Sequence, residues 1–318
     1  MRPVLQAFTS PKCSRHAPGG GFPERKERLD VVLRALRSAE VTIEEVSAQP
    51  GALEAIEALH EREYVERFRR AVARGDGLFD SADNPIVAGS WDAALGAVEA
   101  ALAAADWLVA GTSRVAFAAV RPPGHHAERD LAMGFCFFGN AAVAAQYLID
   151  RHGFARPALF DFDVHHGNGT QHLFEDRADV LYASTHQFPF YPGSGAASER
   201  GRGDGLGTTL NVPLPAGSGD AVHLEAIEKR VLPALAAFEP DVLVLSAGFD
   251  SWQGDPLGGM TVTREGFAEW GRRLGRFARR HCDGRALVLL EGGYDLEELG
   301  DLVVAHLQGL EEGMAGSG

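Results

Sequence analysis

One stretch of the chain decides how the rest is interpreted: Asp161-Phe162-Asp163-Val164-His165-His166-Gly167-Asn168-Gly169. It follows Ala158-Leu159-Phe160, an apolar run that is typical of the start of a buried strand. Charged side chains at the end of such a strand are costly to bury unless a partner compensates them, and a metal ion does so well. Asp163 and His165 are two residues apart, so they point to the same side of an extended chain. The stretch therefore predicts a buried strand that carries two ligands of a divalent metal.

The composition indicates an ordinary soluble protein. The chain has 318 residues and is 45% apolar, enough for one large core or two small ones. Its formal net charge is −14, which argues against non-specific binding to nucleic acid or to anionic membranes. An acidic surface is compatible with cationic substrates, although many acidic proteins are simply soluble. We expect no nucleic acid and no membrane among the partners.

The cysteines and the chain start indicate a cytoplasmic protein. Cys13, Cys136 and Cys282 have unrelated spacings and give neither a disulfide framework nor a CxxC zinc motif. A reducing compartment suits such a set. The first residues lack the apolar segment of a signal peptide. The longest apolar region, 93–105, is far too short to span a membrane.

Strand-like and helix-like runs alternate along the chain. Near-continuous apolar strands that alternate with helices are typical of a parallel sheet covered on both faces. We therefore expect a single α/β domain over residues 1–312, followed by a disordered tail at 313–318. The expected strands are 115–120, 158–162, 180–184, 242–247 and 286–290, and the expected helices are 27–37, 91–104, 140–151, 221–238 and 265–281.

Each of these five strands ends in polar side chains. In open parallel sheets, ligands bind outside the carboxyl ends of the strands. Five such ends on one edge of the sheet would bring all of these side chains into one site. The residues are His125 and His126 after the first strand, Asp161, Asp163 and His165 after the second, Ser184 and His186 after the third, Asp250 after the fourth, and Tyr294 after the fifth.

The residues favour a metal centre with three protein ligands. Asp163 and His165 supply two, and Asp250 at another strand end is the best third. Two carboxylates and one imidazole suit zinc or ferrous iron and leave positions open for water and substrate. The alternative for any one of these Asp residues is a helix cap or a turn.

The remaining polar side chains suit acid–base chemistry. His125 and His126 follow a Pro-Pro-Gly turn, and an imidazole titrates near neutral pH, as a proton shuttle must. Tyr294 follows two glycines, and its hydroxyl could donate to a carbonyl oxygen that becomes negative. The alternative for Tyr294 is a core tyrosine with a satisfied hydroxyl. Phe135 and Tyr191 lie in glycine-containing loops and would either form a narrow apolar slot or anchor those loops.

Six motifs spread over most of the chain carry a resemblance: Arg121-Pro122-Pro123-Gly124-His125-His126-Ala127-Glu128, Gly134-Phe135-Cys136-Phe137-Phe138, the stretch 161–170, Ser246-Ala247-Gly248-Phe249-Asp250, Gly254-Asp255-Pro256-Leu257-Gly258-Gly259, and Glu291-Gly292-Gly293-Tyr294. The chain resembles the zinc-dependent histone deacetylase superfamily, which has an arginase-like fold. The motif sequences are most similar to those of the class II branch and of the bacterial deacetylase-like amidohydrolases, with the acetylpolyamine amidohydrolases as relatives.

The resemblance implies the catalytic roles. Zinc would bind Asp163, His165 and Asp250. His126 would act as general base and acid, with His125 beside it as an electrostatic helper.

The resemblance also implies how the substrate is held. Tyr294 would bind the acetyl carbonyl and stabilise the tetrahedral oxyanion. Phe135, in the Gly134-Phe135 turn, and Tyr191 would flank the tunnel for the acyl-lysine side chain.

Further residues around the site take supporting roles by the same resemblance. Asp161 would orient His125 and help to bind a potassium ion together with the Ser184 hydroxyl. His186 would stand behind the residues that touch the metal or the substrate. Arg28 resembles the family's basic residue on the inner channel for acetate release.

Three positions depart from the family pattern or bear on the substrate. Asn168 stands where the class I branch has Asp as the partner of the second histidine. A neutral amide raises the pKa of His126 less than a carboxylate would, which favours a neutral base. Trp252 is bulkier than the family residue and would narrow the mouth of the site or stack on a substrate. Leu257 replaces the Glu of the polyamine-selective eukaryotic branch, which favours acyl-lysine peptides or small acylated amines.

The sequence therefore predicts a metal-dependent amidohydrolase that removes acetyl or other acyl groups from an amine such as the lysine side chain. The alternative within the same fold is an amidohydrolase that acts on acetylpolyamines or on another small acyl amide. The non-enzymatic alternative is a metal-dependent binding module without turnover. A homo-oligomer stays open, as does the choice between zinc and iron.

Overall fold

The computed structural model describes residues 4–19 and 21–316. The chain forms a large parallel sheet and a small hairpin of β3 (Leu78–Phe79) and β4 (Ser81–Pro85). The strands of the large sheet are β1 (Val4–Thr9), β2 (Thr42–Glu45), β5 (Arg114–Ala118), β6 (Pro157–Asp161), β7 (Leu181–Gln187), β8 (Thr209–Leu214), β9 (Val242–Ala247) and β10 (Arg285–Leu290).

Within the described ranges this sheet has eight strands in the order β2-β1-β5-β10-β9-β6-β7-β8. Every neighbouring pair is parallel. The single α/β domain with a central parallel sheet, expected from the sequence, is confirmed. Its order places the carboxyl ends of β5, β10, β9, β6 and β7 side by side, so the five polar strand ends do lie on one edge.

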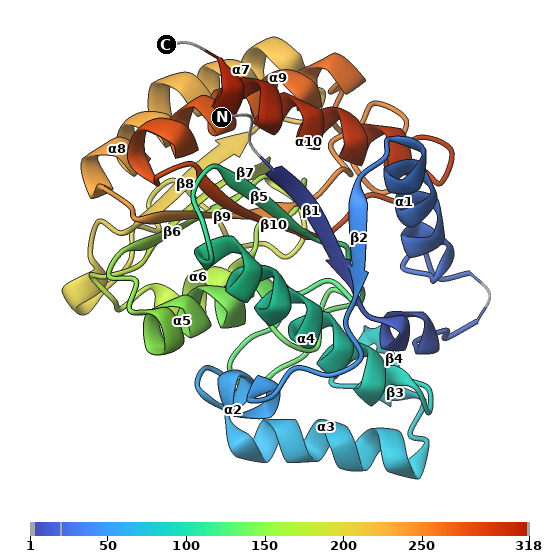
Figure 1. Cartoon of the computed structure of the whole chain (residues 1–318). Helices are drawn as coiled ribbons and strands as arrows, with labels where there is room; N and C mark the ends of the chain where they lie inside the picture. Colours follow the sequence, from blue (N-terminus) through green and yellow to red (C-terminus); the bar gives the residue numbers. More distant parts are fainter. Residues whose placement is uncertain (1–3, 20, 317–318) are drawn as a thin grey trace.

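Helices cover both faces of the sheet (Figure 1). On one face α9 (Arg264–His281) and α10 (Leu299–Ala315) pack against each other and against the strands, and α1 (Glu27–Ser38) packs on α10. On the other face lie α4 (Ser90–Val109) and α5 (Asn140–His152). The other α-helices of the described residues are α2 (Ala52–Glu57), α3 (Arg62–Arg74), α6 (Asn168–Phe174), α7 (Asp220–Ala226) and α8 (Leu232–Phe238).

The central strands lie where their apolar runs predict. β9 has the expected bounds, and β5, β6 and β10 differ from expectation by one or two residues. β7 is longer than predicted and continues to Gln187, because it pairs with β8 as far as Leu214. Ser184 and His186 therefore lie inside β7 rather than after it.

The edge strands carry weaker signals in the sequence. β2 is a largely exposed Thr-Ile-Glu-Glu segment at one edge. β8 contains Pro213 and lies at the other edge, where the missing amide hydrogen of a proline is tolerated. The helix expected at 221–238 is interrupted by a π-helical turn at Ile227–Val231. Pro233 follows this turn and has no amide hydrogen to continue the regular α-helical ladder.

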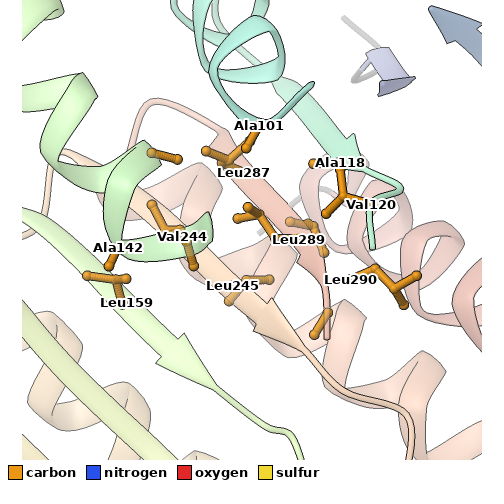
Figure 2. Packing of buried hydrophobic residues seen from close by; sticks show 14 of the residues in the cluster. Ala101, Ala118, Val120, Ala142, Leu159, Val244, Leu245, Leu287, Leu289 and Leu290 are labelled. Atoms are coloured by element: carbon orange, nitrogen blue, oxygen red, sulfur yellow. The ribbon is translucent and has the colours of Figure 1, made fainter. Parts of the chain in front are cut away.

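The core lies between the sheet and its helices. Leucine, valine and alanine side chains from β5, β6, β9 and β10 meet small side chains of α4 and α5, among them Ala101 and Ala142 (Figure 2). Ala101 and Ala142 are fully buried, and their size lets these two helices approach the strands closely. This close packing holds the central strands, and so their carboxyl ends, in a rigid arrangement.

The chain end differs from the expectation of a disordered tail at 313–318. α10 continues to Ala315, so the prediction is wrong for residues 313–315, while 317–318 lie outside the described residues. The reason is packing: Gly313 lies against the backbone of Arg272 in α9, and Met314 is buried.

Two other expectations concern compartment and membranes. Cys13, Cys136 and Cys282 all fall in the described ranges, are buried, and form no disulfide. Among the described residues, no helix combines the length and apolar character that crossing a membrane requires.

The α9–α10 contact gives a stability test. A side chain at Gly309 would collide with the carbonyl of Ala268. We expect Gly309→Val to lower the free energy of unfolding by about 1–3 kcal/mol, because overpacking forces the helices apart. Urea unfolding measures this change. The matched control is Gln308→Val on the exposed side of the same helix, and an equal loss in both variants would contradict the packing explanation.

Candidate active site

The three expected metal ligands meet between two neighbouring strands. Asp163 and His165 follow β6, and Asp250 follows β9, which pairs with β6. One ligand atom of each residue lies within 4.8 Å of the others. His165 Nδ1 is 3.0 Å from Asp163 Oδ1 and 3.2 Å from Asp250 Oδ2. Both carboxylates are fully buried.

The surroundings of these carboxylates fit a bound cation. Asp250 Oδ2 is buried and has no well-aligned hydrogen bond among the described residues, although His165 Nδ1 lies 3.2 Å away, and such an oxygen is costly unless another group binds it. Glycines stand where any side chain would fill the space: a Cβ at Gly248 would collide with Asp163, and one at Gly292 with both Asp163 and Asp250. Two oxygens and one nitrogen suit zinc or ferrous iron. These residues therefore form a candidate metal site.

The electrostatics of the carboxylates lead to the same conclusion. Burial, followed by repulsion from Asp163, raises the pKa of Asp250 to about 7. Burial also opposes the charge on Asp163, but His125 and His165 hold the pKa of that carboxyl below its usual range. Two facing carboxylates thus compete for charge, and a divalent cation between them would relieve that competition.

His126 has its proton placed by its neighbour. Its Nδ1 is 2.7 Å from Asn168 Oδ1, while Asn168 Nδ2 donates to Glu128. Because the carboxylate of Glu128 can only accept, the amide oxygen of Asn168 faces the histidine, and Nδ1 of His126 donates. Nε2 is then the basic nitrogen. Burial, followed by the charges of His125 and His165, lowers the pKa of His126 well below its ordinary value.

His125 is held in the opposite protonation state. Its Nδ1 is 3.0 Å from Asp161 Oδ2, the contact that the resemblance implies. Burial disfavours the imidazolium, but Asp163 and Asp161 outweigh it and raise the pKa of His125 to about 10. The two rings are 4.0 Å apart, so a charged His125 and a neutral His126 stand side by side.

Tyr294 is positioned by groups on both sides of its glycine turn. Arg28 donates through Nε to the Gly293 carbonyl at 2.6 Å, and its guanidinium lies 4.7 Å from the centre of the Tyr294 ring. Asp255 accepts the backbone N–H of Tyr294 at 2.6 Å. Burial raises the pKa of the Tyr294 hydroxyl well above its usual range, so the hydroxyl stays a donor. Arg28, expected on an inner channel, lies directly behind this turn.

A cavity of about 200 Å³ opens above these groups. The expected slot residues Phe135 and Tyr191 line it, together with Gly134, Leu257 and Tyr294. The cavity reaches His126 and His165, so it joins the surface to the candidate metal site.

Two residues that line the slot, and one that supports its wall, were not expected from the sequence. Phe190 lines the cavity and stacks on His165 at 5.2 Å. Asp83 accepts the Gly134 N–H at 3.1 Å and the Tyr191 hydroxyl at 2.9 Å, which ties the two walls together. Asn84 accepts the N–H of Phe135, which has a φ of 66°, rare for a bulky residue. Of these three residues, only Phe190 could have been predicted from the sequence, because it is an aromatic residue next to Tyr191.

The remaining predicted residues lie further out. Trp252 does not line the cavity in the described part of the chain; its indole N–H donates to Asp295 at 3.1 Å instead. His186 contacts the Ser184 hydroxyl at 2.8 Å and the Gly195 carbonyl at 2.9 Å. His186 thus ties β7 to the loop that carries Tyr191.

Fold and site together point to a metal-dependent hydrolase. A histone deacetylase domain matches residues 22–310, and the chain therefore belongs to the histone deacetylase family. Together with its deacetylase and aminohydrolase relatives, this membership makes it a hydrolase that acts on amide bonds.

Relatives are found in archaea and bacteria. The probable deacetylase of Archaeoglobus fulgidus is 39% identical over 306 residues, covering 95% of this chain and 84% of the relative. The histone deacetylase-like amidohydrolase of Pseudomonas aeruginosa is 40% identical over 295 residues, covering 92% and 76%. Among solved structures, an acetylpolyamine aminohydrolase from Burkholderia pseudomallei has a TM-score of 0.88 at 34% identity, covering 98% of this chain and 99% of that chain.

The ligand set predicts how metal content responds to mutation. We expect Asp250→Ala to lose bound divalent metal, because it removes one of three protein ligands. Elemental analysis of the purified protein measures this. Asp241→Ala is the control, since Asp241, directly before β9, accepts the backbone N–H groups of Ala155 and Arg156 ahead of β6. Full metal content in Asp250→Ala would refute the assignment.

The Asn168 contact predicts a pH effect. A carboxylate at this position would stabilise the His126 imidazolium and raise its pKa, so the acid limb of kcat/KM should move up by about 1–3 pH units. Because Glu128 would repel the new carboxylate, we combine Asn168→Asp with Glu128→Gln. Glu128→Gln alone is the control. An acid limb that stays in place in the double variant would show that His126 does not set it.

Proposed function

We propose that this protein is a zinc-dependent amidohydrolase that removes acetyl or other acyl groups from an amine such as the lysine side chain. The observation that carries the proposal is the cavity between Phe135 and Tyr191, which leads to His126 and His165. A narrow aromatic slot accepts an extended aliphatic chain and presents its terminal amide to the groups below.

A divalent metal on Asp163, His165 and Asp250 would supply Lewis-acid polarisation of the acyl carbonyl and lower the pKa of water. The chain's own groups move the protons and hold the substrate. His126 accepts the proton of the attacking water at Nε2 and later gives it to the leaving amine. The Tyr294 hydroxyl donates to the carbonyl oxygen as it becomes negative.

The proposal includes a potassium ion near the catalytic pair. Asp161 on β6 and Ser184 on β7 are register partners, and both are fully buried. A monovalent ion bound there would offset part of the charge of Asp161, which already holds His125. Potassium analysis after exhaustive dialysis, with and without Ser184→Ala, tests this part.

The slot favours acylated lysine over larger substrates. Its walls are aromatic, and Leu257 adds an apolar side chain to its lining. A peptide that carries acyl-lysine would place only its side chain in the slot.

A second candidate is an acylated polyamine. Asp83 lines the same cavity, and among the described residues no lysine or arginine forms an ion pair with it. A carboxylate at this point would attract the free ammonium group of such a substrate. The acetylpolyamine aminohydrolase of Burkholderia pseudomallei has the same fold.

A substrate panel on metal-loaded protein separates these candidates. It contains an acetyl-lysine peptide, acetylputrescine and lysine peptides with longer acyl chains. The proposal expects the highest kcat/KM on an acyl-lysine peptide. Higher activity on acetylputrescine would favour the second candidate, and turnover on no acyl amide would refute both.

Tyr294→Phe tests the oxyanion role. We expect kcat to fall by roughly 10²–10³-fold, the usual cost of removing one oxyanion donor, with metal still bound. Tyr147→Phe is the matched control, because the Tyr147 hydroxyl contacts Asp106 outside the cavity. Near wild-type turnover in Tyr294→Phe would remove this tyrosine from the mechanism.

A further inference from the structure

Glu291 connects three neighbouring strand ends beneath the active site. It follows β10, is fully buried, and its Oε2 accepts the backbone N–H groups of Gly124 at 2.6 Å and His125 at 3.2 Å. Its Oε1 accepts the hydroxyl of Ser246 on β9 at 3.2 Å. Gly124 and His125 belong to the turn after β5, which pairs with β10.

Burying a carboxylate here costs more free energy than a neutral acceptor for the same two N–H groups would. Glu291 is buried near two other carboxylates. Burial raises its pKa to about 7, against the opposing effects of His125 and the Gly124 N–H, while Asp161 and Asp163 add to the rise. Buried charges of like sign are costly unless cations or hydrogen-bond donors compensate them. Among the described residues, no lysine or arginine forms an ion pair with Glu291.

The turn that Glu291 binds is fixed on its other sides as well. The His125 carbonyl accepts the Thr170 N–H at 3.1 Å. Gly124 lies so close to Asn140 that a side chain there would collide with the Asn140 backbone. Glu291 therefore supplies the bonds on the remaining side, directly before the two histidines.

We infer that Glu291 is a positioning residue, which sets through the Gly124 and His125 N–H groups the direction in which His125 and His126 leave their turn. The inference rests on the proposed amidohydrolase function and adds a residue to it. Glu291 acts through the backbone: among the described residues its carboxylate accepts hydrogen bonds from Gly124, His125 and Ser246 and forms none with Asp163, His165 or Asp250. A small rotation of the turn would displace Nε2 of His126, and a misplacement of about 1 Å can cost on the order of 100-fold in rate.

Two substitutions separate positioning from simple stabilisation. Glu291→Ala removes the acceptor, whereas Glu291→Gln keeps an amide oxygen that can accept both N–H groups. For Glu291→Ala we expect kcat to fall roughly 10–100-fold, with KM and bound metal within about twofold of wild type. For Glu291→Gln we expect most of kcat to return. A purely structural carboxylate would lower the yield or stability and leave kcat per folded molecule unchanged.

Glu99→Ala is the matched control. Glu99, on α4, is also a buried glutamate, but it forms an ion pair with Lys12 at 2.7 Å. It should lose stability without losing kcat. If Glu291→Ala does not accumulate as folded protein, Ser246→Ala serves instead, because it frees Oε1 from its hydroxyl donor; we expect a fall in kcat of a few-fold at unchanged KM.

The outcomes are distinct from those that test the function itself. Wild-type protein without turnover refutes the proposed function. Active wild-type protein with wild-type kcat in Glu291→Ala, or a fall that only matches lost metal, overturns the positioning role. A Glu291→Gln variant as slow as Glu291→Ala also overturns it, since the backbone acceptor would then not be what matters.

Discussion

The burial of carboxylates in one place is the constraint on which the rest of the site depends. Asp161, Asp163, Asp250 and Glu291 are all fully buried at the carboxyl ends of three adjacent strands. Isolated charges in such a position are prohibitive unless cations and donors surround them. Three features compensate this buried negative charge or make room for it. They are the glycines beside the carboxylate oxygens, the charged His125 and the candidate metal site.

The same charges divide the work of the two adjacent histidines. His125 faces Asp161 and Asp163 and is held positive, whereas His126 faces a neutral amide and is held neutral. Environments that push neighbouring pKa values apart are how a site obtains an acid and a base from similar groups. Asn168 is central to this division, because its amide leaves His126 free to accept a proton.

Much of the fold and the centre of the site could be predicted from the sequence. β9 was expected with its observed bounds. Asp163, His165 and Asp250 were expected to come together and do so, although Asp163 and His165 lie in the bend after β6 rather than on one face of an extended strand. Contacts between residues that are far apart in the sequence could not be predicted from it. Asp83 comes from a hairpin about fifty residues before the loop that it supports, and Glu291 was seen only as part of a motif. Trp252 was expected near the mouth of the site, but its side chain points to Asp295 instead. The size of a side chain does not determine the direction in which it points.

The central claim is that these buried carboxylates form a metal centre that drives amide hydrolysis. The most direct measurement is a zinc titration of chelator-treated protein that follows bound metal and hydrolysis of an acetyl-lysine peptide together. The account predicts that turnover rises in proportion to occupancy and levels off at one ion per chain. Full turnover in metal-stripped protein, or one bound ion without turnover on any acyl amide, would contradict it.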